Sequence, residues 1–151
     1  MDAIDVKIIE CLKMNSRENA SVIGNKVNMS VSAVIERIKK LESSGIIKQY
    51  TVVLNSEMLG MDLTAFVFVN TEHPKYNAGF IDFVSSHPQI IECHSVTGDF
   101  DFLLKVCVNN TKGLENLLNE INCVSGVFLT KTQVVLSTDK ENYSADIRAE
   151  Q

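Results

Sequence analysis

The sequence predicts an α+β protein built from two domains, a helical one over residues 1–50 and a mixed one over residues 63–138. In the first fifty residues, apolar side chains recur at the spacing of amphipathic helices. Beyond residue 62, short runs rich in β-branched residues alternate with two amphipathic segments. The charge divides in the same way: residues 1–50 carry eight Lys or Arg and six Asp or Glu (+2), whereas residues 51–151 carry six and thirteen (−7), which together give the net charge of −5. We therefore expect two domains with different partners.

The composition excludes several classes of protein. Hydrophobic residues make up 45% of the 151, enough to bury a core, yet no apolar run approaches the roughly 20 residues that span a bilayer. The acidic opening MDAIDVKIIE does not resemble a secretory signal, so we expect a cytoplasmic protein with no membrane partner. The four cysteines form no C-x-x-C pair and the three histidines are scattered, so buried free thiols are expected and no metal site. No catalytic constellation or phosphate loop is present, so we expect no enzyme and no cofactor.

Three helices are predicted in residues 1–50. The first runs from Asp2 to Met14, and the second follows Asn19, an N-cap candidate. The stretch Asn28-Met29-Ser30 is predicted to be the turn before the third helix, because Asn tolerates a left-handed backbone and Ser is a favoured N-cap. Gly45 stands where a left-handed C-cap is expected. The apolar residues assigned to the inner faces are Ile4, Ile8, Ile9, Leu12, Val22, Ile23, Val27, Val31, Val34, Ile35, Ile38 and Leu41.

A short helix, a tight turn and a longer helix form a helix-turn-helix, whose second helix enters the major groove of DNA. The side chains predicted to face away from the core on this helix are Ser32, Ala33, Glu36, Arg37 and Lys40. Small residues let the backbone approach the groove, an arginine binds guanine or phosphate, and lysines bind phosphates. The candidate DNA-binding residues are Asn28, Ser30, Ser32, Ala33, Glu36, Arg37, Lys39 and Lys40. The alternative is a three-helix interaction module, on whose solvated face Glu36 and Lys40 form a stabilising i, i+4 pair.

Residues 46–54 are predicted to be extended, and residues 51–62 to form a connecting strand or hinge after a winged helix-turn-helix domain. The second domain is predicted to contain strand 63–70, a helix opening near Pro74, strands 90–97 and 100–108 around a tight turn at Gly98-Asp99, a helix over Leu114–Ile121, and strand 127–136. The order β-α-β-β-α-β is the ferredoxin-like motif. Residues 139–151 form a polar tail.

The strand over residues 63–70 is apolar on both faces. Ala65, Val67 and Val69 alternate with Phe66 and Phe68. A ferredoxin-like sheet carries helices on one side only, so its other apolar face would meet water at a cost of about 25 cal/mol per Å². We therefore expect a second copy to pack against this face as a homodimer, with a bound partner protein as the alternative.

These residues resemble the Lrp/AsnC, or feast/famine, family of transcriptional regulators. In the first domain the resemblance rests on Ile4-Asp5 with Ile8, Arg17, Met29-Ser30, Arg37, Leu41-Glu42, Gly45 and Ile47. In the second it rests on Val96-Thr97-Gly98-Asp99-Phe100-Asp101, which is similar to the family's Gly-Asp-x-Asp turn. The departures are Met29 for Leu, Asn28 for Gly and Gly24 for Ala, and none removes a DNA-contacting type of residue.

The resemblance implies a DNA-binding regulator of transcription that forms dimers, often assembles into octamers, and binds a small effector, usually an amino acid, between effector domains. Carried over by position, the effector-binding candidates are Thr97, Gly98, Asp99, Phe100 and Asp101. An acidic side chain can pair with an α-ammonium, while exposed backbone N–H groups hold an α-carboxylate. A plain hairpin turn is the alternative for this stretch, and further candidates for lining the site are His94, Thr130 and Thr132.

Two other functions fit the sequence less well. Sirohaem decarboxylases resemble the same family, but they need His and Arg to bind a polycarboxylate tetrapyrrole, and beyond residue 50 the only arginine is Arg148 in the tail. A DNA-architectural protein without an effector would share the helix-turn-helix. A response to amino acids would distinguish the regulator from it.

Overall fold

The computed structural model describes residues 1–146 and divides into two compact units. Unit 1 contains residues 1–53 and the segment that begins at Asn142, and unit 2 contains Leu54–Glu141. Of the predicted polar tail, residues 147–151 lie outside the described residues, and residues 139–146 contain no helix or strand.

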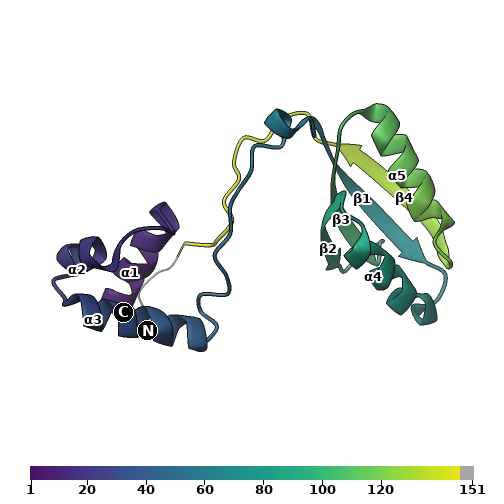
Figure 1. Ribbon diagram of the computed structural model, residues 1–151. Helices are drawn as coiled ribbons and strands as arrows, with labels where there is room; N and C mark the ends of the chain where they lie inside the picture. Colours follow the sequence, from purple (N-terminus) through teal and green to yellow (C-terminus); the bar gives the residue numbers. More distant parts are fainter. Residues whose placement is uncertain (147–151) are drawn as a thin grey trace. The chain divides into compact units, whose positions relative to one another are not determined.

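Unit 1 is built from three helices, α1 (Ala3–Met14), α2 (Ala20–Val27) and α3 (Val31–Ser43), as predicted (Figure 1). Its core combines residues from all three: Ile8, Ile9, Ile23, Val34 and Leu41. Four of the other predicted inner residues pack around this core, namely Ile4, Leu12, Val27 and Ile38. The remaining three are exposed instead: Val22, Val31 and Ile35.

The turn between α2 and α3 is tight. Asn28 adopts the predicted left-handed conformation (φ 56°, ψ 49°), and the side chain of Ser30 caps α3 by accepting a hydrogen bond from the Ala33 N–H at 3.3 Å. Gly24 lies against this turn, because a Cβ there would stand 2.7 Å from the carbonyl oxygen of Met29. A glycine that weakens α2 by its helix propensity thus allows the helix to approach the turn closely.

Residues 46–62, all of which the structure describes, contain no strand. The segment is therefore neither a connecting strand nor a wing, and the alternative of a hinge stays a prediction. The segment is irregular apart from the 3-10 turn η1 (Glu57–Leu59), which ends at Gly60. Val52, Val53 and Leu54 are more than half exposed. A β-branched run becomes a strand only beside a hydrogen-bonding neighbour, and this segment belongs to no sheet among the described residues.

Unit 2 has the predicted order of elements. These are β1 (Leu63–Thr71), the 3-10 turn η2 (Pro74–Tyr76), α4 (Asn77–Ser86), β2 (Ile90–Ser95), β3 (Phe102–Val108), α5 (Thr111–Cys123) and β4 (Val127–Val134). The strands form one antiparallel sheet in the order β2-β3-β1-β4. This arrangement confirms the ferredoxin-like fold.

The two helices of unit 2 lie against one face of the sheet (Figure 1). Ala65, Val67 and Val69 of β1 are fully buried there, together with Phe80 of α4 and Leu117 of α5. The alternation predicted for β1 is therefore confirmed, because one of its two apolar faces supplies the centre of the core.

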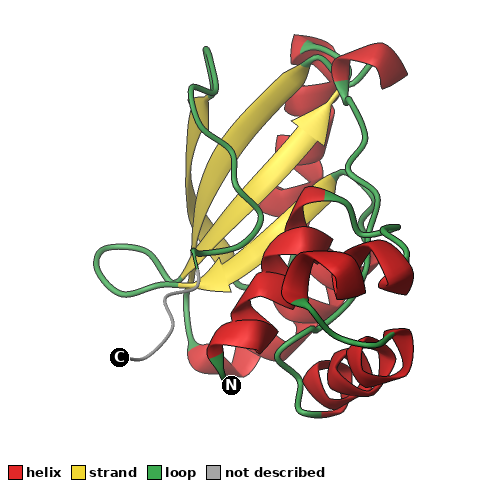
Figure 2. Ribbon diagram, turned by 90° about the vertical axis from the view of Figure 1, so that its left-hand side faces the viewer, coloured by secondary structure: helices red, strands yellow, loops and turns green. Residues whose placement is uncertain are grey.

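The other face of the sheet is left open by both helices (Figure 2). Phe66 and Phe68 lie on this face, with Leu103 of β3 beside Phe68 and Leu129 of β4 beside Asn70 in the strand register. Leu129 is 47% exposed, and the two phenylalanines and Leu103 are half-buried. An apolar surface thus remains on the sheet after the chain has folded.

Three further observations concern the remaining expectations. All four cysteines are free; of the three with apolar neighbours in the sequence, Cys107 is buried and Cys11 and Cys93 are half-buried, and Cys123 is exposed. Strands β2 and β4 end two residues before their predicted ends. Among the described residues, no helix is both long and apolar enough to cross a bilayer.

Candidate functional site

The predicted DNA-binding residues lie on α3 and on the turn before it. The exposed ones are Asn28, Ser30, Ser32, Glu36, Lys39 and Lys40, and Ala33 is half-buried. The hydroxyl oxygens of Ser30 and Ser32 are 3.1 Å apart at the start of the helix, the end that meets base edges in a helix-turn-helix. The two lysines lie about two turns further on, where phosphate contacts are expected.

The inner face of α3 is narrower than predicted. Val31 is 46% exposed and Ile35 is 42% exposed. Because a helix turns by about 100° per residue, Val34, Ile38 and Leu41 lie in one sector, and Ile35 lies to one side of it. On the other side of this sector lie Ala33 and Arg37, which are both half-buried.

Arg37 therefore does not face away from the core, and that prediction is wrong. Its Nη1 donates to Oδ1 of Asp5 at 2.6 Å and to Oδ2 of Asp2 at 2.8 Å, and its side chain is 29% exposed. The hydrogen bonds to Asp2 and Asp5 raise the pKa of Arg37 above its ordinary value. The ion pairs connect the middle of α3 to the first turn of α1.

The two carboxylates are shifted by the same contacts. A hydrogen bond from the Asp5 N–H and then one from Arg37 lower the pKa of Asp2. Burial raises the pKa of Asp5, but the hydrogen bonds from the Asp2 N–H and from Arg37 outweigh it, so this pKa is also lowered overall. Both groups are therefore carboxylates at neutral pH, which is the form that binds Arg37.

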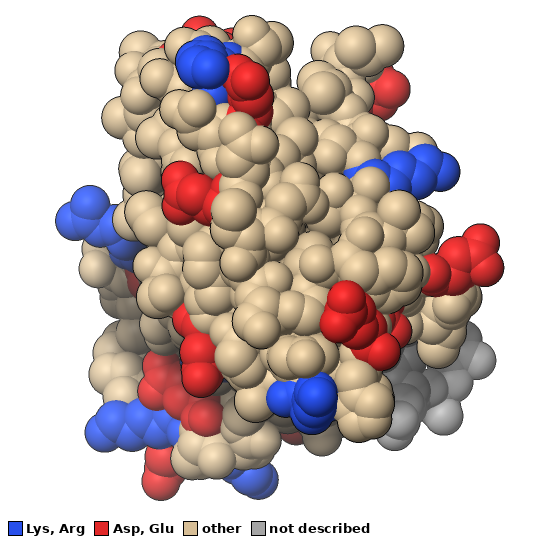
Figure 3. Space-filling model, turned by 90° about the vertical axis from the view of Figure 1, so that its right-hand side faces the viewer, with Lys and Arg blue, Asp and Glu red and all other residues tan. Residues whose placement is uncertain are grey.

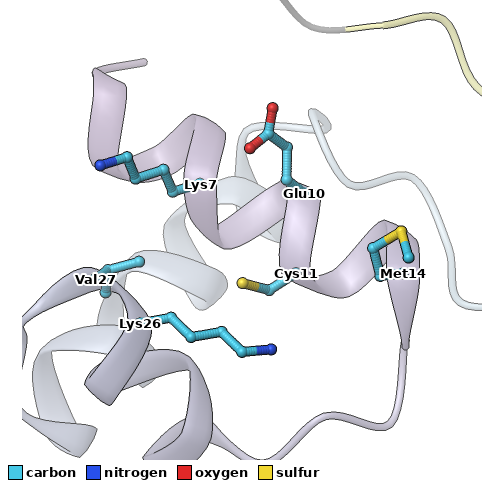
Figure 4. A pocket seen from close by; sticks show the side chains of 6 residues that line it. All are labelled: Lys7, Glu10, Cys11, Met14, Lys26 and Val27. Carbon is cyan, nitrogen blue, oxygen red and sulfur yellow. The ribbon is translucent and has the colours of Figure 1, made fainter.

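A shallow hollow of about 260 Å³ lies between α1 and α2 (Figure 4). Its lining residues are Lys7, Glu10, Cys11, Met14, Lys26 and Val27. None of them belongs to α3, and the charged side chains point in different directions (Figure 4). The hollow lacks the convergent polar groups of a ligand site.

The predicted effector-binding residues lie on the loop over residues 96–101, between β2 and β3. This loop is longer than the predicted tight turn, because β2 ends at Ser95 and β3 begins at Phe102. Gly98 has φ 113°, a conformation that favours glycine. The exposed members of the loop are Thr97, Gly98, Asp99 and Asp101, and Phe100 is half-buried.

Two polar residues at the end of β1 hold this loop, and sequence reasoning missed both. Nδ2 of Asn70 donates to the Asp99 carbonyl at 2.7 Å, and its Oδ1 accepts from the Asp101 N–H at 2.8 Å. Oδ2 of Asp101 accepts from the N–H of Thr71 at 2.9 Å and from its hydroxyl at 3.2 Å. A polar pair at the end of an apolar strand was the available signal. One oxygen of Asp101 is thus used to shape the loop.

The remaining candidates are placed differently. The ring of Phe100 lies 5.3 Å from that of Phe68, which puts it against the open face of the sheet. Thr130 and Thr132 pair with Val69 and Val67 and so lie on the helix-covered face, away from Phe100. The ring of His94 is bound to Glu92 at 3.1 Å. The structure therefore brings together the residues of the loop and places Thr130 and Thr132 on the other face of the sheet, whereas His94 pairs with Leu103 and lies on the open face with Phe68.

The side of the molecule seen in Figure 3 does not suit a polyanion. On the side seen in Figure 3, the blue side chains of Lys and Arg stand singly and are separated by acidic ones. No continuous basic surface is present on this side, whereas nucleic-acid binding requires a cluster of cations. A helix-turn-helix in unit 1 and an acidic ferredoxin-like unit together define a DNA-binding transcriptional regulator with a separate regulatory domain.

Comparison with known proteins identifies the family. The model of the AsnC-type helix-turn-helix domain matches residues 1–42, and the model of the Lrp/AsnC ligand binding domain matches residues 64–145. The chain therefore belongs to the Lrp/AsnC family of DNA-binding transcriptional regulators, as the sequence indicated. The members that it resembles are regulators and not enzymes.

The relatives match along most of their length. The HTH-type transcriptional regulator FL11 of Pyrococcus furiosus is 34% identical, over 98% of this chain and 97% of its own. LrpB of Bacillus subtilis is 38% identical over 80% of each chain. Among solved structures, the transcriptional regulator NMB0573 of Neisseria meningitidis, in a complex with L-Met, has a TM-score of 0.91 at 27% identity and covers 96% of each chain. LrpC of Bacillus subtilis has a TM-score of 0.85 at 31% identity and covers 94% of this chain and 99% of its own.

Proposed function

We propose that the exposed face of α3 contacts DNA in the major groove. Ser32, Ala33 and Glu36 approach the bases, Lys39 and Lys40 contact phosphates, and Asn28 and Ser30 lie where the helix meets the backbone. The observation that supports this assignment is the exposure of six of these seven residues on the second helix of a helix-turn-helix and on the turn before it. Arg37 is left out of the set because two carboxylates hold its guanidinium.

Salt dependence tests this assignment. Each phosphate contact contributes about −0.9 to the slope of log K against log salt concentration on duplex DNA. We expect Lys39→Gln and Lys40→Gln each to reduce the steepness of the slope by about one in fluorescence anisotropy. Lys112→Gln, which removes an exposed lysine of α5 in unit 2, serves as the control with an unchanged slope. Unchanged slopes for both α3 variants would place the DNA-binding face elsewhere.

We also propose that an amino acid is the effector and that it binds at the loop over residues 96–101. The loop presents exposed backbone next to the carboxylate of Asp99, which suits an α-carboxylate and an α-ammonium respectively. Its shape is held by Asn70 and Thr71 without a ligand, so little conformational entropy is lost on binding. The similar Neisseria regulator carries L-Met in its complex, which supports this class of ligand.

A panel of amino acids tests the effector proposal by thermal shift. A ligand at 100 times its dissociation constant adds about 2.7 kcal/mol to the stability of the state it binds. A bound amino acid should lose affinity when its carboxylate or its ammonium group is absent, so the matching amine and the matching acid are the controls. A melting temperature that no amino acid shifts would leave a DNA-architectural protein as the better interpretation. So would shifts that are equally large when the carboxylate or the ammonium group of the ligand is absent.

We propose that the open face of the sheet pairs two copies into a dimer, as the alternation of β1 predicted. Such a dimer presents two α3 helices, which fit successive major grooves if they lie about 34 Å apart. Effector binding between dimers would then favour one larger assembly, such as an octamer, over another. Sedimentation with and without amino acids measures the assembly, and a monomer at micromolar concentration would contradict the proposal.

A further inference from the structure

We propose that Arg37 is a positioning residue for DNA binding, which fixes α3 to the first turn of α1 through Asp2 and Asp5. The inference rests on the proposed function, because it takes the exposed face of α3 as the surface that meets DNA. It gives the central arginine of the recognition helix a role other than contact with bases or phosphates.

The two carboxylates are held in place by α1 itself. Asp2 is the N-cap of α1, and its Oδ1 accepts from the N–H groups of Ile4 at 2.9 Å and Asp5 at 2.8 Å. Oδ2 of Asp5 accepts from the Asp2 N–H at 2.9 Å, which completes a capping box. Each carboxylate therefore uses one oxygen on the backbone of α1 and its other oxygen on Arg37. The backbone of α1 therefore holds both acceptor carboxylates without help from the guanidinium.

Burial and charge keep Arg37 at this position. The side chains of Arg37 and Asp5 are 29% and 16% exposed, so their ion pair is partly shielded from solvent. Two carboxylates and one guanidinium leave a local charge of −1. Both carboxylates accept from Nη1 of Arg37, and a phosphate that approached Nη2 or Nε would also approach Asp2 and Asp5, which repel it. Charge-assisted hydrogen bonds of this kind are about twice as strong as neutral ones.

The position of Arg37 explains why the link matters for DNA. Arg37 lies between Ser32 at the start of α3 and Lys40 near its end, and its partners are 32 and 35 residues away in sequence. A link at this point sets the rotation of α3 about its axis. That rotation decides which side chains the helix presents to the groove.

The proposal reverses the usual expectation for an acidic residue near DNA. Removing a carboxylate beside a DNA-binding surface ordinarily strengthens binding, because repulsion is lost. If Asp2 and Asp5 position α3, their removal weakens binding instead. Asn is as good an N-cap as Asp, so Asp2→Asn removes the charge and keeps the cap.

The experiment compares full-length variants by anisotropy with duplex DNA over a range of salt concentrations. The variants are Arg37→Gln, the pair Asp2→Asn with Asp5→Asn, and all three changes together. We expect roughly tenfold weaker binding for each of the first two, similar to the loss of one base contact, with an unchanged salt slope. The triple variant should be no weaker than either, because both changes break the same link. Glu10→Gln, an exposed carboxylate of α1, is the control that should not weaken binding.

Four results would overturn the proposal. A salt slope that becomes less steep by about one in Arg37→Gln would show a phosphate contact. Stronger binding by the double Asn variant would show that the two carboxylates only repel DNA. Losses of affinity that add up in the triple variant would show independent roles for Arg37 and the two carboxylates. Ile23→Val trims the same core without touching the link, and circular dichroism checks that every variant is folded. If Ile23→Val lost as much DNA affinity as Arg37→Gln, the effect would come from a general loosening of the core of unit 1 and not from the link to α1. The Lys39 and Lys40 variants test the proposed DNA-binding face separately. A failure of that assignment can therefore be distinguished from a failure of the role proposed for Arg37.

Discussion

The carboxylates of Asp2 and Asp5 make the stability of unit 1 depend on pH. Both have a pKa lowered in the folded state, whereas an unfolded Asp titrates near 3.9. Their contribution is therefore present above about pH 5 and is lost as the pH falls through the lower, folded-state values. We expect the melting temperature of unit 1, followed by amide signals of α1–α3, to fall as the pH is lowered below 5. This fall should be steeper than that of the variant with Asn at both positions. Equal slopes for the two proteins below pH 5 would contradict this.

Gly24 offers a second prediction at the scale of a residue. Alanine in its place gains up to about 1 kcal/mol of helix propensity, but its Cβ would lie 2.7 Å from a backbone oxygen of the α2–α3 turn. Since that oxygen cannot move without the turn, overpacking of this kind costs about 1–3 kcal/mol and should dominate. We expect Gly24→Ala to lower the free energy of unfolding by about 1 kcal/mol in urea denaturation. Asn25→Ala, at an exposed position of the same helix, should not destabilise the unit. A more stable Gly24→Ala would show that the turn yields easily.

The loop between β2 and β3 can be tested as an element through Asn70. The side chain of Asn70 makes two hydrogen bonds to the loop, and its truncation removes both of them, although the Asp101 N–H still donates to the Val69 carbonyl at 3.1 Å. We expect Asn70→Ala to cost about 1–3 kcal/mol of stability, to speed hydrogen exchange at residues 97–101, and to weaken any effector that binds there. Asn119→Ala on the exposed side of α5 is the matched control. Unchanged exchange in Asn70→Ala would show that the loop holds its shape without this residue.

Elements with a strong local pattern were predictable from the sequence, and elements that depend on a partner were not. The three helices of unit 1 and the order of unit 2 follow from apolar spacing and capping residues, including Asn28 and Ser30. The β-branched run at residues 51–54 predicts a strand. The sequence alone does not show that this run has no neighbouring strand to pair with among the described residues. The helical pattern places Arg37 on the outer face because it puts Ile35 and Val31 in the core, and it cannot show the ion pairs with α1, which join residues more than thirty positions apart.

At the scale of the whole molecule, the two units have different roles: unit 1 is the DNA-binding unit, and unit 2 is proposed to join the copies. The DNA-binding unit carries little net positive charge, +2 over residues 1–50, so one copy should bind DNA weakly. Two linked copies bind more tightly, because the second contact becomes intramolecular once the first has formed. If the open sheet of unit 2 joins the copies as proposed, it contributes to DNA affinity together with α3.

Phe66→Asp tests this dependence. It places a charge at the centre of the open face of the sheet, on the central strand β1, and burying an unpaired charge between two copies is unfavourable. We expect its mass in sedimentation to fall to that of a monomer at micromolar concentration, and its DNA affinity to fall by about 10²-fold or more as bivalent binding is lost. Ile81→Asp is the matched control, because Ile81 is an equally apolar, exposed residue on α4, which packs on the other side of the sheet. Circular dichroism should show that both variants are folded. If Phe66→Asp remained dimeric, or if Ile81→Asp dissociated instead, the copies would be joined through another surface. If Phe66→Asp became monomeric and kept its DNA affinity, then a single helix-turn-helix would suffice, and the two units would act independently.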